Sequence, residues 1–398
     1  MPSDQQRLER IQRAIVGSNW DALICSLPTN VLLLSGYWPV VGTSLAVATK
    51  DGQVGLVVPE DEHELAGKSW AHELCTFEGG SLDEIKTATK AVRAPLSQLA
   101  KKLKITGAIG YEAGDFHEPS SYASMHFFGG TLRDIISEAV PNAQLVSADD
   151  QLKALRSVKT PNEIARLRAA CAIAEKAFEH GRKNLCAGLT ETEVAAEFRD
   201  LLSTKGVGFN GVERADGFTF CMSRPNSAEA YAAYQRSRSR ALEPGDLALV
   251  HCNSYADGFW TDITRTFCIG EPDHRKRRLY EAIFAAREAA LKAVRPGAKN
   301  ASVDRAAREI LEKHGFKKEF KHGSGHEVGF SAINHTAHPR IHPASVETLE
   351  TGMVFNIEPG IYIEGWGGMR HCDMVAATDD GAELLTPFQA TLEELIIH

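Results

Sequence analysis

The segments LEPGDLALVH, Leu242 to His251, and LETGMVFNIE, Leu349 to Glu358, share one pattern and align without a gap. Each runs from a leucine through a glycine-containing turn into apolar residues typical of a buried strand, and each ends in a polar side chain. His251 in the first segment corresponds to Glu358 in the second. Such a recurrence indicates two related halves within one chain.

The helical patterns before these strands repeat in the same way. Gly188 and Gly206 in the first half are matched by Gly297 and Gly315 in the second, with the same spacing inside each pair. Each half therefore consists of a helix, a glycine, a capped helix start, a second helix and a second glycine. A chance similarity between such units is the alternative.

The strand after each segment carries a further candidate residue, Asp262 in the first half and Cys372 in the second. Two halves related by a pseudo-twofold axis would bring these residues together with His251 and Glu358. An isolated carboxylate is costly to bury. Asp262, in a strand-like stretch of aromatic and β-branched residues, therefore requires a cation, a hydrogen-bond network or a metal.

A predicted hairpin relates His251 to Asp262. In LALVHCNSYADGFWTDITRTF, residues 247–267, two strand-like runs flank Asp257 and Gly258, a dipeptide typical of tight turns. Because side chains alternate between the two faces of a strand, a two-residue loop places His251 and Asp262 on the same face. A loop of odd length would separate them.

Histidines are concentrated in one later segment. In KHGSGHEVGF, His322 and His326 are four residues apart, but the glycines disfavour a helical zinc-binding pair. In an extended or looped segment the two rings would still point roughly the same way. Between residues 322 and 342 the chain has five histidines, which favours a site: His322, His326, His335, His338 and His342. The residues able to bind a metal are His251, Asp262, His326, Glu358 and Cys372.

The first part of the chain is organised differently. Apolar runs such as DALICS, SLAVAT and QVGLVVP alternate with helical patterns, which is typical of an α/β domain. The chain then turns polar before a new helix start, where Thr160 is an N-cap and Glu163 completes a capping box. The sequence predicts an α/β domain at residues 1–155 and a second domain, with the internal repeat, at residues 156–398.

The composition excludes several classes of protein. The chain has 398 residues, of which 43% are hydrophobic and 24% charged, and a net charge of −8. A net negative charge does not favour binding to nucleic acid or to an anionic membrane. No run of about 18 apolar residues predicts a membrane span. Eight scattered cysteines without a CxxC pair argue against a disulfide framework and a zinc ribbon. A cytoplasmic enzyme is the simplest expectation.

Nearly the whole chain resembles the pita-bread metallohydrolase family, in its creatinase, prolidase and aminopeptidase P branch. The resemblance rests on the N-terminal RLERIQRAIVGSNWDALICSLPTNVLLLSGY and on DGFWTDITRTF, HGSGHEVG, NIEPGIYI and GGMRHCD. It implies an N-terminal creatinase-like α/β domain, a C-terminal pita-bread fold and a homodimer. It also implies that Asp262 bridges two metal ions, that His326 is a ligand and that Glu358 is a ligand near the reacting water.

Two ligand positions depart from the family pattern. His251 stands where the metal-binding members carry an aspartate, and Cys372 stands where they carry the final glutamate. Imidazole and thiolate are softer ligands than carboxylates, so a divalent metal, with zinc favoured over manganese, is expected as one or two ions. Arg370, two residues before Cys372, is predicted to hold a carboxylate of the substrate or of Glu358.

Positions around the site depart as well. Ile333 replaces a family histidine that handles protons and substrate, but His335 and His338 follow closely. His335 or Glu358 is predicted to move protons, and His338 to contact substrate. Tyr231 stands in place of a second substrate histidine. His322 is predicted to support the developing oxyanion or a metal ligand.

These features predict a metal-dependent hydrolase of an amide bond, similar to Xaa-Pro dipeptidases and aminopeptidases, with a short peptide or small amide as substrate. Two alternatives remain open. The first is a creatinase-like hydrolase of a small nitrogenous metabolite that needs no metal. The second is an inactive peptide-binding module with the same fold.

Overall fold

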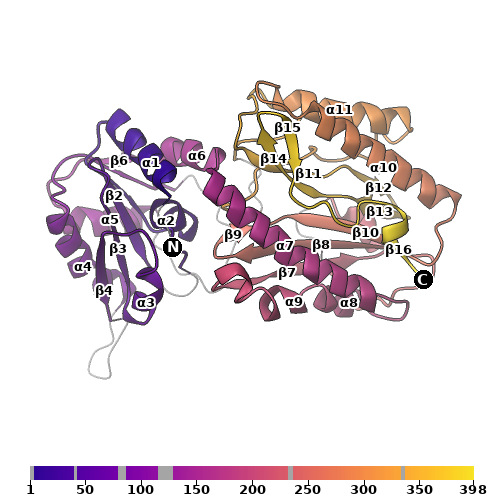
Figure 1. Cartoon of the computed structure of the whole chain (residues 1–398), viewed down its shortest axis with the longest axis horizontal. Helices are drawn as coiled ribbons and strands as arrows, with labels where there is room; N and C mark the ends of the chain where they lie inside the picture. The colour runs from indigo at the N-terminus through magenta and orange to yellow at the C-terminus, as the bar shows by residue number, and fades with distance from the viewer. Residues whose placement is uncertain (1–3, 40–42, 79–86, 115–128, 232–235, 333–336) are drawn as a thin grey trace. The chain divides into compact units, whose positions relative to one another are not determined.

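The computed structural model of the chain describes residues 4–39, 43–78, 87–114, 129–231, 236–332 and 337–398 (Figure 1). The chain divides into two compact units, Met1–Arg156 and Ser157–His398, one residue beyond the predicted boundary. Both units contain helices and sheets, in agreement with the predicted α/β class. Within the described ranges, no helix combines the length and the apolar character needed to cross a lipid bilayer.

The N-terminal unit is built on one six-stranded sheet. Its elements are α1 (Gln5–Gly17), β1 (Ala22–Cys25), α2 (Pro28–Ser35), β2 (Leu45–Thr49), β3 (Val54–Pro59), η1 (Glu60–Glu62), α3 (His63–Ala66), β4 (Glu73–Phe77), α4 (Ala88–Lys102), β5 (Ile109–Tyr111), α5 (Gly130–Ala139), β6 (Leu145–Ser147) and α6 (Asp149–Ser157). The strand order is β4-β3-β2-β1-β5-β6. Apolar side chains of the sheet and of α4 and α5 form one buried cluster. Strands buried in this way are expected to be nearly continuous apolar runs.

The C-terminal unit begins with the capped helix predicted from the sequence. Its helices are α7 (Pro161–Asn184), α8 (Glu191–Glu197), α9 (Asp200–Thr204), η2 (Phe209–Gly211), η3 (Asn226–Glu229), α10 (His274–Ala293), α11 (Asn300–Lys313) and η4 (Glu393–Leu395). The Thr160 hydroxyl accepts the Glu163 N–H at 3.2 Å, and the Glu163 carboxylate accepts the Thr160 N–H at 2.8 Å. The predicted capping box is therefore confirmed.

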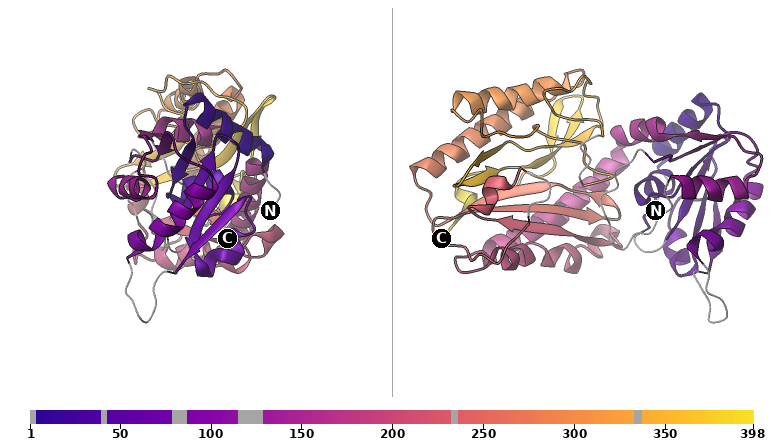
Figure 2. Two further views of the ribbon diagram at one scale, coloured as in Figure 1. Left: turned by 90° about the vertical axis from the view of Figure 1, so that its left-hand side faces the viewer. Right: turned by 180° about the vertical axis from the view of Figure 1, so that it is seen from behind.

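Three sheets form the centre of this unit. The strands are β7 (Ala215–Met222), β8 (Leu247–Ala256), β9 (Phe259–Trp260), β10 (Ile263–Ile269), β11 (Val354–Ile357), β12 (Gly360–Ile363), β13 (Gly367–Arg370), β14 (Asp373–Thr378), β15 (Gly381–Leu384) and β16 (Ile396–Ile397). One sheet has the order β16-β10-β8-β7, with β9 paired to β8, and the others are β11-β14-β15 and β12-β13. The right-hand view of Figure 2 shows the strands of this unit with α10 and α11, in orange, on one side of them. Helices α7, α8 and α9 contact the first sheet, whereas α10 packs on the strands of the others (Figure 1).

The internal repeat is visible in backbone hydrogen bonds. The Gly188 N–H donates to the Leu242 carbonyl over 2.8 Å, and the Gly297 N–H donates to the Leu349 carbonyl over the same distance. The two donors are a pair matched in the sequence, and so are the two acceptors. The same helix-to-strand connection is thus built twice, and the predicted repeat is confirmed.

The hairpin that carries Asp262 has the predicted two-residue loop. Its strands pair across Asp257 and Gly258, whose φ angles of 47° and 83° are those of a type I′ turn. The same register continues into the β8–β10 pair and sets His251 opposite Thr264. Because side chains alternate, His251 and Asp262 lie on the same face.

This turn gives a prediction for stability. Gly258→Ala places a Cβ on a left-handed backbone and should lower the free energy of unfolding by about 1–2 kcal/mol, as measured by urea denaturation. Gly258→Asn is the matched control, because asparagine accepts this conformation more readily, and it should cost less. Equal losses for the two variants would contradict a left-handed Gly258.

A buried charge network joins β10 to the C-terminal part of the unit. The Arg265 guanidinium donates to the Asp373 carboxylate over 2.8 Å, and Arg287 donates to its other oxygen over 2.5 Å. Arg265 and Asp373 are fully buried. Arg265 also donates to the carbonyls of Thr386 and Phe388. The two guanidinium groups therefore share one carboxylate away from water.

Candidate active site

The candidate residues come from both halves of the repeat. His251 lies in β8, and Asp262 lies in the short break between β9 and β10. Glu358 follows β11 and Cys372 precedes β14, and the β11–β14 register, continued by one residue, sets them opposite each other. An antiparallel bridge between Thr264 and Cys372 joins the halves, with N–H···O distances of 3.3 and 3.0 Å. Asp262 and Cys372 are thereby brought side by side.

His326 is placed by a segment that runs along β11. The Asn356 N–H donates to the His326 carbonyl over 3.0 Å, and the Glu358 N–H donates to the Ser324 carbonyl over 2.9 Å. A Cβ on Gly325 would lie only 1.9 Å from the Asn356 carbonyl oxygen. A glycine is therefore required for this close approach, which carries the His326 ring into the site.

The five candidate metal ligands lie together around Asp262. Its carboxylate oxygens are 3.3 Å from His326 Nε2, 3.6 Å from His251 Nδ1 and 3.6 Å from Cys372 Sγ. Glu358 Oε1 is 3.9 Å from His326 Nε2. The residues chosen from the sequence thus converge. Within the part of the chain that the structure describes, however, no three His, Cys, Asp or Glu side chains are arranged to hold a metal ion.

Asn356 is a member of the cluster that sequence reasoning missed. Its Oδ1 accepts the His326 N–H at 2.6 Å, which fixes the orientation of the amide. Its NH₂ group then faces the cluster, with Nδ2 3.3 Å from Asp262 Oδ2, 3.2 Å from His326 Nε2 and 3.5 Å from Cys372 Sγ. The available signal was its position two residues before Glu358, since alternate residues share a strand face.

Arg370 holds the other side of the cluster. A guanidinium group only donates, so His251 Nδ1, 3.0 Å from Arg370 Nη2, is the acceptor. The proton of a neutral His251 then lies on Nε2, 3.0 Å from Asn253 Oδ1. Arg370 also donates to Thr264 Oγ1 over 3.1 Å and lies 3.8 Å from Glu358. Both nitrogens of His251 are thus engaged within the protein, and its role as a metal ligand stays a prediction.

Burial and neighbouring carboxylates determine the protonation states of the site residues. Burial alone would lower the pKa of His326, but the Asp262 hydrogen bond and the Glu358 charge outweigh it and raise the pKa to about 9. Burial, with the charge of Asp262, raises the pKa of the Cys372 thiol well above its ordinary value. Burial lowers the pKa of His251. The cluster at neutral pH therefore holds a protonated His326, a neutral thiol and a neutral His251.

Family descriptions match both units. Residues 7–158 match the Creatinase/Prolidase N-terminal domain. Residues 165–379, more than half of the chain, match metallopeptidase family M24. The chain belongs to metallopeptidase family M24. This membership confirms the predicted family resemblance, and the protein is a hydrolase of the peptidase class.

Relatives of this M24 protein match nearly its full length. The Xaa-Pro dipeptidase of Pyrococcus furiosus is 30% identical over 390 residues, covering 98% of this chain and 99% of the relative. The solved prolidase from Pyrococcus furiosus has a TM-score of 0.72 at 29% identity and covers 94% of this chain and 98% of its own. An X-Pro aminopeptidase from Thermotoga maritima has a TM-score of 0.78 and covers 97% of this chain and 99% of its own, and at 24% identity it supports the fold alone.

A second histidine of the M24 site is held beside the cluster. His322 Nδ1 donates to the Gly323 carbonyl over 2.7 Å, so its Nε2, 2.9 Å from the Tyr362 hydroxyl, is the acceptor. The Tyr362 ring lies 5.7 Å from that of Tyr231, which the Lys321 ammonium approaches at 4.5 Å. Tyr231 is 42% exposed, so it is accessible to a ligand.

The remaining predicted residues are less well placed. His335 lies outside the described residues. His338 is half-buried, and its Nδ1 is buried with no hydrogen-bond partner among the described residues. Burial lowers the pKa of His338. Its predicted contact with substrate remains a prediction.

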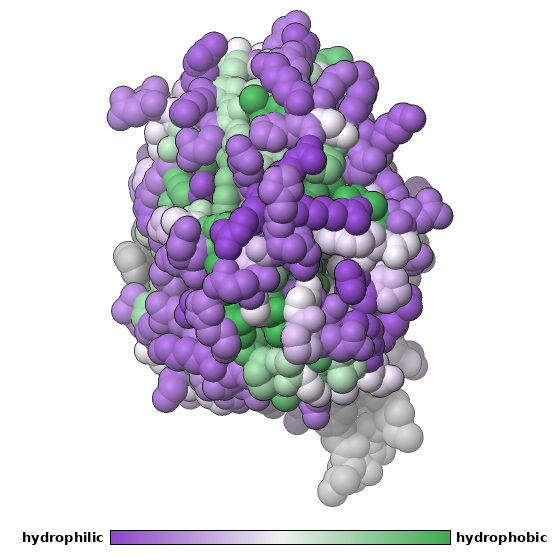
Figure 3. Space-filling model, turned by 90° about the vertical axis from the view of Figure 1, so that its right-hand side faces the viewer, coloured by the Kyte–Doolittle hydropathy of each residue, from purple (hydrophilic) through white to green (hydrophobic). Residues whose placement is uncertain are grey.

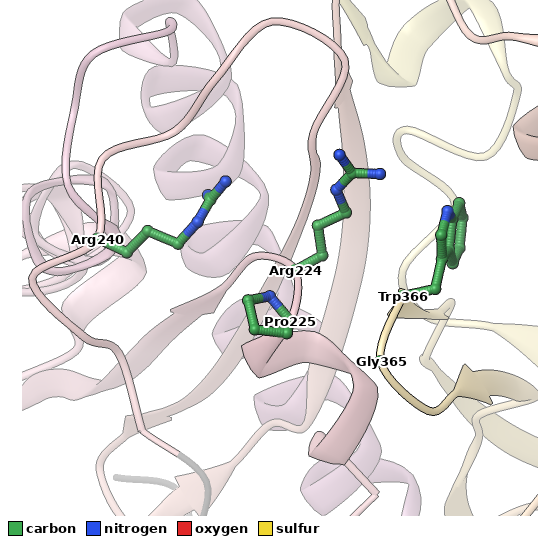
Figure 4. A pocket seen from close by; sticks show the side chains of 5 residues that line it. All are labelled: Arg224, Pro225, Arg240, Gly365 and Trp366. Atoms are coloured by element: carbon green, nitrogen blue, oxygen red, sulfur yellow. The ribbon is translucent and has the colours of Figure 1, made fainter.

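A separate pocket of about 420 Å³ lies at the β12–β13 turn of the M24 unit. Arg224, Pro225, Arg240, Gly365 and Trp366 line it, and Figure 4 shows the Arg224 guanidinium directed toward the Trp366 indole. Both arginines are paired with the Asp246 carboxylate, at 3.5 and 2.5 Å. One carboxylate therefore partly neutralises the two guanidinium groups of this pocket. Hydrophilic residues cover most of the face of the molecule drawn in Figure 3.

Proposed function

We propose that this M24 protein hydrolyses an amide bond in short peptides that carry proline after the scissile bond. The observation that supports this proposal is the buried pair of Glu358 and His326, whose Oε1 and Nε2 are 3.9 Å apart. The relatives named Xaa-Pro dipeptidase and prolidase suggest the substrate class.

The reaction adds water across the bond, so that hydroxyl joins the carbonyl carbon and the leaving nitrogen takes a proton. It needs a base to accept a proton from water and an acid to supply one to nitrogen. Glu358 is proposed as the base and His326 as the acid. Arg370, 3.8 Å from Glu358, would orient that carboxylate or bind a carboxylate of the substrate. His322 is proposed to support the developing oxyanion through Tyr362, whose hydroxyl would turn its proton from His322 Nε2 toward the substrate.

Several predicted roles remain proposals. Tyr231 is proposed to contact substrate from the exposed rim, and its T-shaped contact with Tyr362 supports this placement. His338 is proposed as a substrate contact and His335 as a further group that moves protons. A homodimer and a cytoplasmic location are carried forward as expectations.

The predicted cofactor is a divalent metal. The family is described as one of metallopeptidases, and zinc, as one or two ions, is the predicted cofactor. A bound ion would lower the pKa of water and polarise the carbonyl. Asp262, His326, Glu358 and Cys372 would be its donors. This donor set does not fit an ion as arranged, because the Asn356 amide donates toward both the Asp262 carboxylate and Cys372 Sγ. No step is therefore assigned to an ion.

A creatinase-like hydrolysis of a small nitrogenous compound is the second candidate function. The position of Arg370, held beside His251 over 3.0 Å, favours it only for a compound that carries a carboxylate, which the guanidinium would bind. An inactive peptide-binding module is the third.

Proline release by the purified full-length protein tests the proposal. We expect turnover of Ala-Pro and Met-Pro but not of Pro-Ala. Turnover of a guanidino or cyclic amidine compound instead would support the second candidate. Binding of Xaa-Pro peptides without any turnover would overturn the proposal in favour of the binding module.

A further inference from the structure

Two hydrogen-bond donors of the protein lie where the candidate metal ligands converge. The first is the Asn356 NH₂ group, within 3.2–3.5 Å of atoms from Asp262, His326 and Cys372. Its orientation is not free, because Asn356 Oδ1 accepts the His326 N–H at 2.6 Å. Asn356 is fully buried. A reversal of the amide would place an oxygen against the Asp262 carboxylate and would lose the bond to the backbone.

The second donor is the Arg370 guanidinium. It lies 3.0 Å from His251 Nδ1 and 3.8 Å from Glu358, and its Nε donates to Thr264 Oγ1 over 3.1 Å. Its side chain is 10% exposed, so water screens this charge little. Arg370 therefore brings a permanent positive charge to the end of the cluster that Asn356 does not reach.

A metal ion would need lone pairs of the candidate ligands that already accept hydrogen bonds from these donors. Tetrahedral zinc takes at least three protein lone pairs at about 2.0–2.3 Å. Both His251 nitrogens are engaged, one by Arg370 and one by Asn253. The Asp262 and Cys372 acceptors face the Asn356 hydrogens. A dication placed here would also be repelled by the guanidinium, and this repulsion is strong where burial limits screening.

We infer that the Asn356 amide and the Arg370 guanidinium take the place of metal ions in this M24 protein, which holds its site together without a metal. The carboxylates of Asp262 and Glu358 are compensated by donors of the chain itself. Metal binding does not depend on which amide is cleaved, and only the activity measurement below rests on the proposed function.

The test uses the full-length protein without a histidine tag, dialysed against a chelator and then against buffer. Zinc and manganese chlorides are titrated by calorimetry, and the melting temperature is recorded with each metal. We expect less than about 0.1 equivalent of retained metal, no binding isotherm and no rise in Tm. Retention of about one or two equivalents, with a Tm that rises on adding zinc, would overturn the inference.

A matched variant tests the Asn356 donor directly. His251→Asp with Asn356→Ala removes the amide donor and restores a carboxylate, and this double variant should gain zinc binding that the parent protein lacks. A folded double variant that binds no more zinc than the parent would contradict the assigned role of Asn356. If the double variant does not fold, Asn356→Ala alone is titrated with zinc. More zinc binding than in the parent would support the assigned role of Asn356, and no more than in the parent would contradict it.

Activity separates this inference from the proposed function. Proline release that is unchanged after chelator dialysis supports both. No proline release and no zinc binding would reject the Xaa-Pro proposal and leave the inference intact. Proline release that appears only when zinc is added would reject the inference and keep the proposal.

Discussion

Glu358→Gln should lower kcat/KM for an Xaa-Pro dipeptide by about 10²- to 10⁴-fold, the usual contribution of a general base. Glutamine keeps the size of the side chain but cannot accept a proton from water. Glu358 is 8% exposed and lies beside His326 and Arg370, so the loss should come from the reacting groups. Steady-state proline release, with circular dichroism to verify folding, measures the effect.

Glu364→Gln is the matched control for this prediction. Glu364 lies in the turn after β12, only six residues along the chain, and is exposed. Its substitution should leave kcat/KM unchanged within about twofold. A folded Glu358→Gln enzyme with the activity of the Glu364→Gln control would show that Glu358 is not the base.

Asp373→Ala should lower the free energy of unfolding by about 3–5 kcal/mol, the typical cost of removing one partner from a buried ion pair. The change leaves Arg265 and Arg287 without their shared carboxylate, and Arg265 is fully buried. Urea denaturation followed by circular dichroism gives the value. The residue lies next to Cys372, so stability rather than activity is the appropriate measurement.

A surface ion pair in the same unit provides the comparison. Arg168 and Glu383 are 2.7 Å apart, with side chains 50% and 33% exposed. Glu383→Gln should cost less than about 1 kcal/mol, because water screens an exposed pair. Losses of similar size for Asp373→Ala and Glu383→Gln would contradict the account of the buried network.

Much of the C-terminal unit was predictable from spacing. The pairs matched in the sequence reappear as equivalent backbone hydrogen bonds, for example from Gly188 and from Gly297. The Asp257-Gly258 dipeptide fixed the register of the β8–β9 hairpin, because a type I′ turn suits a two-residue loop between twisted strands. These features depend on local backbone chemistry, which a sequence expresses directly.

The charge balance of the site was not predictable in the same way. His251, Asp262, Glu358 and Cys372 do converge, as the repeat indicated, and His326 from the histidine-rich segment joins them. Whether a side chain offers a lone pair or a proton depends on partners far away in the chain, as with the bond from Arg370 to His251 and that from the His326 backbone to the Asn356 side chain. No pattern within one strand contains that information. The role of Asn356 therefore required the three-dimensional arrangement.

The proposed cluster adds water to an amide bond. The most direct measurement is hydrolysis of Ala-Pro in ¹⁸O-labelled water, with mass spectrometry of the released alanine. We expect alanine with one labelled carboxylate oxygen, formed at the rate of proline release and lost in Glu358→Gln. Intact Ala-Pro after incubation with folded enzyme, or labelled alanine formed equally by Glu358→Gln, would contradict the proposal.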